Sequence, residues 1–320
     1  MRLFHVLFAV LFVAAVLMGI GSCADNSELP VSAGVGPEPT LPPPKKTLLP
    51  TVNVAKAKGW NNGQKPVAAD GLAVEPFATG LDHPRWLYVL PNGDVLVAET
   101  NAQEKKLKGL RGRVQKSVMK RAGAGAISAD RITLLRDADG DGVAETRTVF
   151  LSELTSPFGM SLIDDRFYVA NTDGVVSFPY IDGETEIVAT ATPVSALPAG
   201  ELNHHWTKNL IASRDGKFLY ASVGSNSDHG ENGMDKEEGR AAIWEIEVGT
   251  GDSRLFATGL RNPVGMAFEP TSGMLWTAVN ERDELGGDLV PDYMTSVVDD
   301  GFYGWPYSYY GDNLDPRIED

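Results

Sequence analysis

Short apolar runs alternate with turn residues along most of the chain, and from about residue 70 they form a repeat. Each copy has a Gly/Pro/Asn turn, an apolar run of strand length, a Gly/Asp turn and a second apolar run. Such runs between turn signals predict β-hairpins, and the repeat region has no long stretch with the periodicity of a helix. The copies lie at residues 80–99, 156–171, 204–223 and from 261 onward.

The spacing of the repeat favours a β-propeller over a β-sandwich. In a propeller the innermost strand of each blade begins near the central channel, so the equivalent turns of the repeat should converge on one mouth. Histidine, cationic and amide side chains gathered at one mouth would indicate a functional pocket. The side chains expected there are His83, Arg85, Phe158, His204, His205, Lys208, Arg261 and Asn262.

The N-terminal part has a different pattern. An apolar run, Leu3–Ile20, ends at Ile20-Gly21-Ser22-Cys23, which resembles a bacterial lipobox. This predicts a lipoprotein signal peptide over 1–22 with Cys23 lipidated; the alternative is an uncleaved membrane helix, since the run is almost long enough to span. Residues 23–66 are rich in proline, which predicts an extended linker. We therefore expect an exported protein, anchored to a membrane by its lipid, in a bacterial periplasm or at the cell surface.

Charge and cysteine content exclude several classes of protein. The formal net charge is −15, so nucleic acid is not an expected partner, because its phosphates would repel the chain. Cys23 is the one cysteine of the sequence, which excludes an intrachain disulfide and a Cys-x-x-Cys zinc site. Residues 105–121 form a basic run. We interpret this run as a solvated inserted loop, with contact to an anionic partner or lipid headgroups as the alternative.

Several segments together carry a resemblance to a known family. They are Asn203-His204-His205-Trp206-Thr207-Lys208-Asn209-Leu210, Gly259-Leu260-Arg261-Asn262-Pro263-Val264-Gly265-Met266-Ala267-Phe268, Leu275–Glu284 and Gly301-Phe302-Tyr303-Gly304-Trp305-Pro306. In this order they resemble the glucose/sorbosone dehydrogenase family, whose members are β-propellers that use pyrroloquinoline quinone (PQQ) and calcium. The resemblance implies an all-β, six-bladed propeller over residues 67–320, of which about four to five blades are present in this chain.

The resemblance also implies roles for four residues. The family's catalytic base aligns with His205, and an imidazole is suited to take a hydroxyl proton near neutral pH while hydride leaves the carbon. Arg261 and Asn262 would hold PQQ, because an arginine with several donors suits carboxylate and quinone oxygens. Lys208 is a further candidate for the same pocket. The structural alternatives are a packed or surface histidine, and a turn held by Asn262 with Arg261 in solvent.

A calcium ion is expected beside the cofactor. The resemblance implies that this active-site ion is bound by the backbone oxygens of Asn280, Glu281 and Arg282. Calcium prefers oxygen ligands and would polarise the quinone carbonyl as a Lewis acid.

A second calcium signal is independent of the resemblance. Asp137, Asp139 and Asp141 occupy positions 1, 3 and 5 of an EF-hand-like loop, with glycine at position 6. Position 12 is Thr148 in place of the usual glutamate, and the flanks have the composition of strands. We interpret the loop as a structural calcium site in a blade, with a plain acidic turn as the alternative.

The sequence therefore predicts a membrane-anchored, PQQ-dependent dehydrogenase of the sorbosone type, acting on a sugar or sugar aldehyde with an unknown electron acceptor. The alternatives are a calcium-dependent propeller hydrolase of the lactonase type and a non-enzymatic binding propeller. The chain ends at Asp320, shortly after the Gly-Trp-Pro segment. The resemblance implies further cofactor-binding lysine and arginine residues in blades beyond this point. We expect residues 67–320 to be a fragment of a longer enzyme or the product of a shortened reading frame.

Overall fold

The computed structural model of the chain describes residues 27–45, 55–60, 63–103, 117, 119–123 and 126–318. Among these residues, no helix is long and apolar enough to cross a membrane. The signal peptide over 1–22, the lipidated Cys23 and most of the basic run 105–121 lie outside the described residues, and they stay predictions. Two short 3-10 helices, η1 (Val31–Gly34) and η2 (Met234–Lys236), accompany a structure that is otherwise built mainly of strands.

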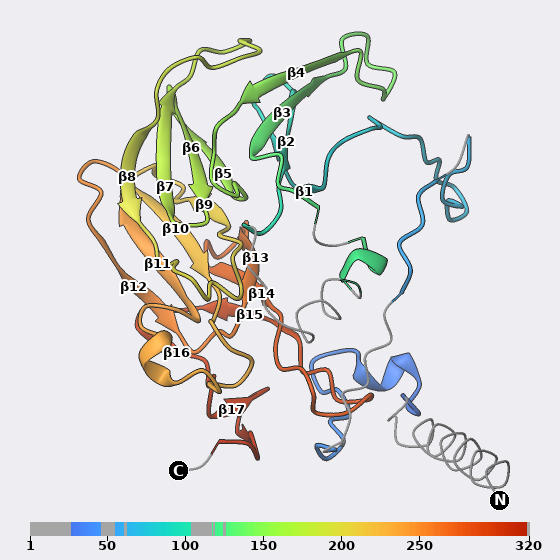
Figure 1. Cartoon of the computed structure of the whole chain (residues 1–320), viewed down its shortest axis with the longest axis vertical. Coiled ribbons are helices and arrows are strands. Elements are labelled where there is room, and N and C mark those ends of the chain that lie inside the picture. Colours follow the sequence, from blue (N-terminus) through green and yellow to red (C-terminus); the bar gives the residue numbers. More distant parts are fainter. Residues whose placement is uncertain are drawn as a thin grey trace, which may run out of the picture.

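Four sheets follow one another along the described chain, each made of consecutive antiparallel strands (Figure 1). The first blade is β1 (Pro84–Val89), β2 (Val95–Glu99), β3 (Arg131–Arg136) and β4 (Thr146–Leu151). The second is β5 (Met160–Ile163), β6 (Arg166–Asn171), β7 (Gly174–Pro179) and β8 (Thr192–Ala196). The third is β9 (Leu210–Ala212), β10 (Phe218–Val223), β11 (Ala242–Glu247) and β12 (Ser253–Thr258). The fourth is β13 (Pro263–Phe268), β14 (Leu275–Val279) and β15 (Tyr293–Val297).

The segment after the fourth blade returns to the third. Strand β16 (Gly301–Phe302) pairs in parallel with β12, and a hairpin of β17 (Ser308–Tyr309) and β18 (Asn313–Leu314) follows. The described part of the chain thus holds four blades in sequence order, which confirms the predicted all-β propeller architecture.

The hydrophobic core lies between neighbouring blades, as propeller packing requires. Between the first two blades, the rings of Phe150 and Phe167 pack edge to face, 5.6 Å apart, and both are fully buried. A second cluster joins the second and third blades around Leu219 and Ala170. A third joins the third and fourth blades around Ile243. Strands β2, β3 and β6 are buried along nearly their whole length, because each lies inside its blade with a neighbouring blade packed on its face.

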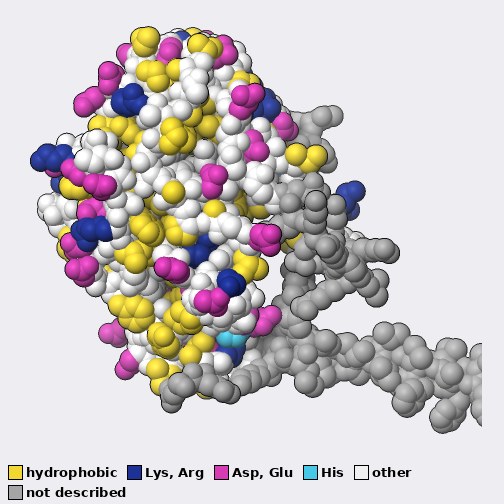
Figure 2. Space-filling view, turned by 60° about the vertical axis from the view of Figure 1, so that its left-hand side comes forward, with side chains coloured by type: hydrophobic (Ala, Val, Ile, Leu, Met, Phe, Trp, Pro, Cys, Tyr) yellow, Lys and Arg dark blue, Asp and Glu magenta, His cyan; other side chains and the backbone are white. Residues whose placement is uncertain are grey.

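The first and fourth blades each carry apolar side chains on the face turned away from their neighbour. On β1, Leu87 is 61% exposed, whereas Trp86 and Tyr88 pack into the core. On the fourth blade, Met294 is 71% exposed and Trp276 is partly exposed. Figure 2 shows hydrophobic side chains lying among scattered acidic ones over one face of the molecule.

Residues 27–45, which we call the N-terminal strap, lie against the fourth blade. The Asp288 carboxylate accepts hydrogen bonds from the Ser27 hydroxyl at 2.6 Å and from the backbone N–H of Leu29 at 3.0 Å. The N–H of Lys45 donates to the carbonyl of Leu285 at 2.9 Å. This part of the proline-rich stretch is therefore docked on the blade, although it was predicted to be an extended linker. The boundary at residues 66 and 67 stays a prediction.

Close approach of the second and third blades depends on Gly159. A Cβ atom at this position would lie 2.2 Å from the Leu210 nitrogen and 2.6 Å from the Asn209 carbonyl carbon. The Gly159 N–H also donates to the Lys208 carbonyl at 3.0 Å. Backbone atoms cannot yield as a flexible side chain can, so the contact requires the absence of a side chain.

We predict that Gly159→Ala lowers the free energy of unfolding by about 3 kcal/mol, the upper part of the range for overpacking. Gly249→Ala is the matched control, because a Cβ atom there meets nothing within 4 Å, and it should stay within about 0.5 kcal/mol of the wild type. Urea denaturation measures both changes. Equal stability of the two variants would contradict the blade contact.

Candidate active site

A cavity of about 380 Å³ lies where the turns that lead into the third and fourth blades face the loop after β14. Of the side chains expected at the propeller mouth, His205, Arg261 and Asn262 line it. The predicted calcium segment lines it as well. The full lining is His205, Arg261, Asn262, Asn280, Glu281, Arg282, Asp283, Glu284, Gly286, Leu289, Val290 and Asp292.

His205 is held in one tautomer by the turn after β10. Its Nδ1 lies 2.9 Å from the Ser225 carbonyl and 3.0 Å from the Ser225 hydroxyl. That hydroxyl donates its proton to the Ser227 carbonyl at 2.6 Å, so both Ser225 oxygens act as acceptors toward the ring. Nδ1 therefore carries the proton, and Nε2 keeps the lone pair that a base needs.

The electrostatic surroundings keep His205 neutral. Burial, together with the positive charge of Arg261 and the neighbouring His204, lowers the pKa of His205 to about 2. His204 is exposed, and its ring lies edge to face with that of His205 at 4.6 Å. His205, to which the resemblance implies the role of base, is thus the more buried of the adjacent pair.

Two buried charged residues that the sequence analysis did not identify hold the segments around His205. Glu237 accepts a hydrogen bond from the Asn226 N–H at 2.7 Å and another from the Ser227 hydroxyl, which fixes the turn under His205. Arg240 donates to the His205 carbonyl at 3.1 Å and to the Asn203 side chain at 3.2 Å. Burial raises the pKa of Glu237 and lowers that of Arg240 to about 10.

Lys208 lies behind His205, outside the cavity lining. Its side chain is fully buried, and its Nζ lies 3.4 Å from the His205 carbonyl. Burial, reinforced by the charge of Arg240, lowers its pKa well below the usual value. The contact of Lys208 with the cofactor stays a prediction.

Arg261 uses all five of its N–H donors within the protein. Nε donates to the Asp228 carbonyl at 3.0 Å, and Nη2 donates to the Asp228 carboxylate and to the Asp283 carboxylate at 3.1 Å. Nη1 donates to the carbonyls of Asn280, at 3.3 Å, and Glu281. Two of the three backbone oxygens predicted to bind calcium therefore face the Arg261 guanidinium.

Two residues that line the cavity, Asn262 and Glu281, carry side-chain oxygens of the kind that bind a cation. Oδ1 of Asn262 and Oε2 of Glu281 are buried and have no hydrogen-bond partner among the described residues. Burial raises the pKa of Glu281 to about 7, although the positive charges of Arg282 and Arg261 act in the opposite direction. Unpaired buried oxygens are costly, and oxygen ligands are what calcium prefers, so this donor set fits a hard cation.

Arg282 joins the loop after β14 to the C-terminal part of the described chain. Its side chain is fully buried and donates to Glu281 at 2.7 Å, to Asp315 at 2.6 Å and to the Pro306 carbonyl at 2.6 Å. It also lies over the ring of Tyr309 at 5.6 Å. The side chain thus ties the cavity wall to the β17–β18 hairpin.

The remaining side chains of the expected mouth pack with one another. Arg85 lies over the ring of Trp206 at 5.4 Å, and Phe158 contacts the same ring edge to face at 6.3 Å. They share the central end of the blades with His205 but do not line the cavity. Neither does His83, whose carbonyl accepts a hydrogen bond from the Thr100 N–H.

The acidic loop lies between β3 and β4, as the sequence predicted. Ligand atoms of Asp137, Asp139, Asp141 and Glu145 lie within 4.8 Å of one another. Thr148, at the twelfth position of the pattern, belongs to β4 and donates to the Thr185 carbonyl instead. Glu145 therefore supplies the fourth carboxylate from within the loop. The structural calcium ion assigned to this loop stays a prediction.

The fold is that of a propeller, and the candidate site is a polar cavity beside its third and fourth blades. A model of the TrAA12-like family matches residues 66–295, and the chain belongs to that family. The match covers the first three blades, most of the fourth, His205 and the cavity loop.

Curated relatives agree with this assignment. The pyrroloquinoline quinone-dependent sugar dehydrogenase of Hypocrea jecorina is 22% identical over 233 residues, which are 69% of this chain and 48% of that protein. The aldose sugar dehydrogenase YliI of Escherichia coli is 26% identical over 146 residues, which are 41% of this chain and 37% of that protein. The chain spans about half the length of the curated relatives it matches, or less.

Solved structures share the fold. The calcium structure of the Trichoderma reesei enzyme of carbohydrate-active family AA12 has a TM-score of 0.60 at 19% identity, covering 80% of this chain and 66% of that one. The holo PQQ domain of Coprinopsis cinerea pyranose dehydrogenase has a TM-score of 0.57 at 18% identity, covering 77% and 61%. The resemblance to quinoprotein sugar dehydrogenases, drawn from sequence segments, is thereby confirmed.

The depressed pKa of His205 makes a prediction about acid stability. In the unfolded chain its imidazole has the ordinary pKa of 6.5, so between pH 6.5 and 2 the unfolded state binds a proton that the folded state does not. The stability of the folded state is therefore complete above pH 6.5 and decreases as the pH falls. At pH 5 the loss from this residue should be about 2 kcal/mol.

His205→Gln should remove this contribution. We expect the decrease in unfolding free energy between pH 7 and pH 5 to be about 2 kcal/mol smaller in the variant than in the wild type. Urea denaturation at the two pH values measures the difference. Identical decreases in both proteins would show that His205 titrates normally.

Proposed function

We propose that the chain is the site-bearing part of a PQQ-dependent dehydrogenase that oxidises a sugar or sugar aldehyde, with His205 as the general base. The observation that carries the proposal is that His205 lines the cavity together with Arg261 and Asn262, while Ser225 holds its Nδ1–H and leaves Nε2 unprotonated. Membership in the TrAA12-like family and the PQQ named in several relatives support it. Sorbosone-type substrates and an electron acceptor of unknown identity belong to the same proposal.

The cavity fits the cofactor and its ion through three groups. Asn262 and Glu281 each offer an unpaired buried oxygen to calcium. Arg261 offers positive charge to a ligand carboxylate, and of its partners Asp283 is the most exposed, at 77% of its side chain. Asp283 is therefore the partner of Arg261 that solvent already reaches, and a bound carboxylate would take its place on Nη2 while Asp228 keeps its own bonds to the guanidinium.

The proposed reaction breaks one C–H bond and one O–H bond of the substrate. When bound, PQQ supplies the two-electron acceptor for the hydride. Nε2 of His205 takes the hydroxyl proton, while Ser225 holds Nδ1–H and so keeps the imidazole in the correct tautomer. Arg240 and Lys208 donate hydrogen bonds to the His205 carbonyl, and these bonds fix the position of the backbone that carries the ring.

Basicity of His205 depends on what occupies the cavity. A base with a pKa of about 2 is unprotonated but weak, and nearby positive charge contributes to that value. Carboxylates bound beside Arg261 would offset this charge and raise the pKa of His205 toward neutrality. An anionic cofactor would then improve the base as well as accept the electrons.

A calcium-dependent hydrolase of the lactonase type is the second candidate. The observation that favours it is the ring of carboxylate and amide groups around the cavity, which includes Asn262, Glu281 and Asp292. Such a ring suits a catalytic metal ion without a quinone. The two candidates differ in one assay: dye reduction requires added PQQ, whereas lactone hydrolysis requires calcium alone and stops with a chelator.

We predict that His205→Gln lowers PQQ-dependent dye reduction by about 10²–10⁴-fold, the usual cost of losing acid–base catalysis. PQQ binding, measured by titration of the quinone absorbance, should persist, because glutamine adds no charge. His204→Gln is the control and should keep most of the activity. Full activity in His205→Gln with loss in His204→Gln would assign the base to the other histidine.

We predict that Asp283→Ala increases the affinity for PQQ several-fold. The substitution frees Nη2 of Arg261 and removes a negative charge that competes with the cofactor carboxylates. Glu284→Ala is the matched control, since Glu284 is an exposed acid lining the same cavity without a bond to Arg261 among the described contacts. Equal increases in affinity for both variants would show that the loss of any nearby negative charge explains the result. Weaker binding in Asp283→Ala would contradict the role of Arg261 in the cofactor site.

A further inference from the structure

The loop after β14 lies between the candidate active site and the N-terminal strap. Glu284, Gly286 and Val290 of this loop line the active-site cavity. Leu285 and Asp288, which alternate with them along the chain, accept hydrogen bonds from the strap. The loop is thus a wall of a single segment, so a contact on its outer side can set the shape of the cavity on its inner side.

Asp288 holds the first residues of the strap. Its Oδ1 accepts hydrogen bonds from the Ser27 hydroxyl at 2.6 Å and from the N–H groups of Glu28 at 2.9 Å and Leu29 at 3.0 Å. Hydrogen bonds to an ionised carboxylate are stronger than those between neutral groups. One side chain therefore binds three donors of a segment that is distant in the sequence.

The other end of the strap has contacts of its own with the same loop. The N–H of Lys45 donates to the Leu285 carbonyl at 2.9 Å. Leu41 packs against the apolar cluster that contains Leu285 and Leu289. The two ends of the strap are therefore bound on either side of one short stretch of chain.

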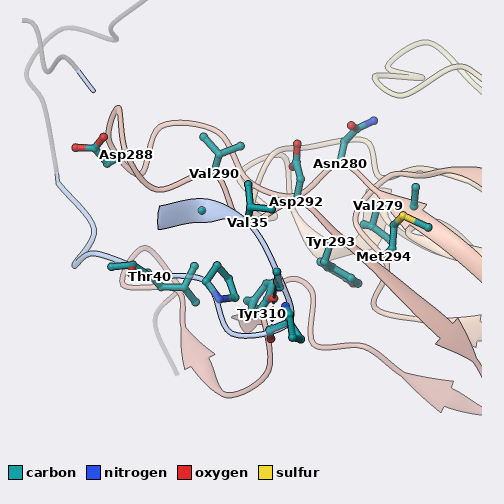
Figure 3. A pocket seen from close by; sticks show the side chains of 16 residues that line it. Val35, Thr40, Val279, Asn280, Asp288, Val290, Asp292, Tyr293, Met294 and Tyr310 are labelled. Carbon is teal, nitrogen blue, oxygen red and sulfur yellow. Dashed lines mark hydrogen bonds between the residues drawn. The ribbon is translucent and has the colours of Figure 1, made fainter. Parts of the chain in front are cut away.

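The middle of the strap is only loosely packed. Figure 3 shows Val35 and Thr40 of the strap among the side chains that line a second cavity, of about 590 Å³, together with Met294 of the fourth blade. Helix η1 buries none of its residues, and the Tyr310 hydroxyl donates to the Pro37 carbonyl at 3.3 Å. Segments with few buried apolar contacts open at low free energy. The strap can therefore undock without unfolding of the blade.

The loop itself is held in a costly conformation. Glu284 has a φ of 64°, in the left-handed region that favours glycine. Such a backbone persists only where the surrounding structure fixes it. Glu284 lines the active-site cavity and directly precedes Leu285, whose carbonyl binds the strap. Undocking of the strap removes a constraint next to the strained residue.

We propose that Asp288 is a positioning residue for the candidate active site. By binding the strap, it holds the loop after β14 in the shape that forms the cavity wall, and undocking of the strap lets the loop relax at Glu284. Docking of the strap and binding of a ligand in the cavity are then coupled, and by linkage each favours the other. The hydrogen bonds from Ser225 to His205 are outside this coupling.

Hydrogen exchange of the full chain tests the proposal without any ligand. In Asp288→Ala the N–H of Lys45, at the other end of the strap, should exchange about tenfold faster. The N–H of Asp283, which donates to the Asp228 carboxylate at 3.1 Å, should do the same as the loop relaxes. Asp312→Ala is the matched control, because Asp312 is exposed and lines neither cavity. Unchanged exchange at Asp283 in Asp288→Ala overturns the proposal.

A second variant releases the strap from its other end. Leu41→Ser removes the apolar contact with the loop, and it should speed exchange of the Leu29 N–H, which is bound at Asp288. Val31→Ser is its control within the strap, because Val31 is 89% exposed. Faster exchange at Leu29 in Asp288→Ala alone would show two separate contacts and contradict a strap that docks as a unit.

Binding of PQQ tests the coupling, and this part rests on the proposed function. Asp288→Ala should weaken the affinity for PQQ several-fold, measured by titration of the quinone absorbance. Asp288→Asn should weaken it less, because an amide oxygen still accepts hydrogen bonds from Ser27 and Leu29. In the wild type, PQQ should slow exchange of the Lys45 N–H. Equal affinity in the wild type and Asp288→Ala overturns the coupling.

The two proposals can fail separately. Exchange at Asp283 that depends on Asp288, in a wild type that does not bind PQQ, would support the positioning role and reject the proposed function. PQQ-dependent dye reduction, with exchange at Asp283 unchanged in Asp288→Ala, would support the proposed function and reject the positioning role.

Discussion

A buried guanidinium holds the candidate active site together. Arg261 is 2% exposed, and its donors end on Asp228, Asp283 and two carbonyls of the loop after β14. A buried cation without such partners would cost several kcal/mol, so the loops that supply the acceptors are constrained to stay where they are. The positions of the cavity walls follow from this requirement.

The same constraint extends to the C-terminal hairpin through alternating charges. Asp228 also pairs with Arg317 at 3.2 Å, Arg317 pairs with Asp315 at 2.8 Å, and Asp315 pairs with Arg282 at 2.6 Å. The chain of pairs starts in the third blade and ends in the wall of the cavity. Each member of the network pairs with at least two others, so the charges support one another and the hairpin is held from several sides. Residues after β16 are thereby part of the site, although none of them lines the first cavity.

Sequence reasoning predicted the inner half of each blade and the residues with chemical signatures. Apolar runs between turn signals are local features, so the hairpins of β1–β2, β5–β6 and β13–β14 followed from the pattern alone. His205 and Arg261 were found because a short segment preserves their surroundings. The partners of these residues were not found, since Glu237 and Asp228 come into contact with the site through packing over long sequence separations. Nothing local distinguishes these two carboxylates from the many acids of a chain with a net charge of −15.

The docking of the strap was missed for a related reason. Prolines and few large apolar residues are typical of a linker, and the strap has no core of its own. Its position comes from Asp288, whose carboxylate accepts hydrogen bonds from Ser27 and Leu29, and from Leu41, which packs against Leu285 and Leu289. The composition of a segment shows whether it can form a core of its own. It does not show which contacts residues distant in the sequence make with it.

The candidate site and the N-terminal strap belong to different parts of the chain. His205, Arg261, Asn262 and Glu281 all lie within residues 66–295, the part that matches the family. The strap lies outside this match and contacts the loop after β14 through the Asp288 carboxylate, the Leu285 carbonyl and a small apolar cluster. The hydrogen bonds that set the tautomer of His205 come from Ser225, and the charges that lower its pKa come from Arg261 and its neighbours, so neither depends on a contact with the strap.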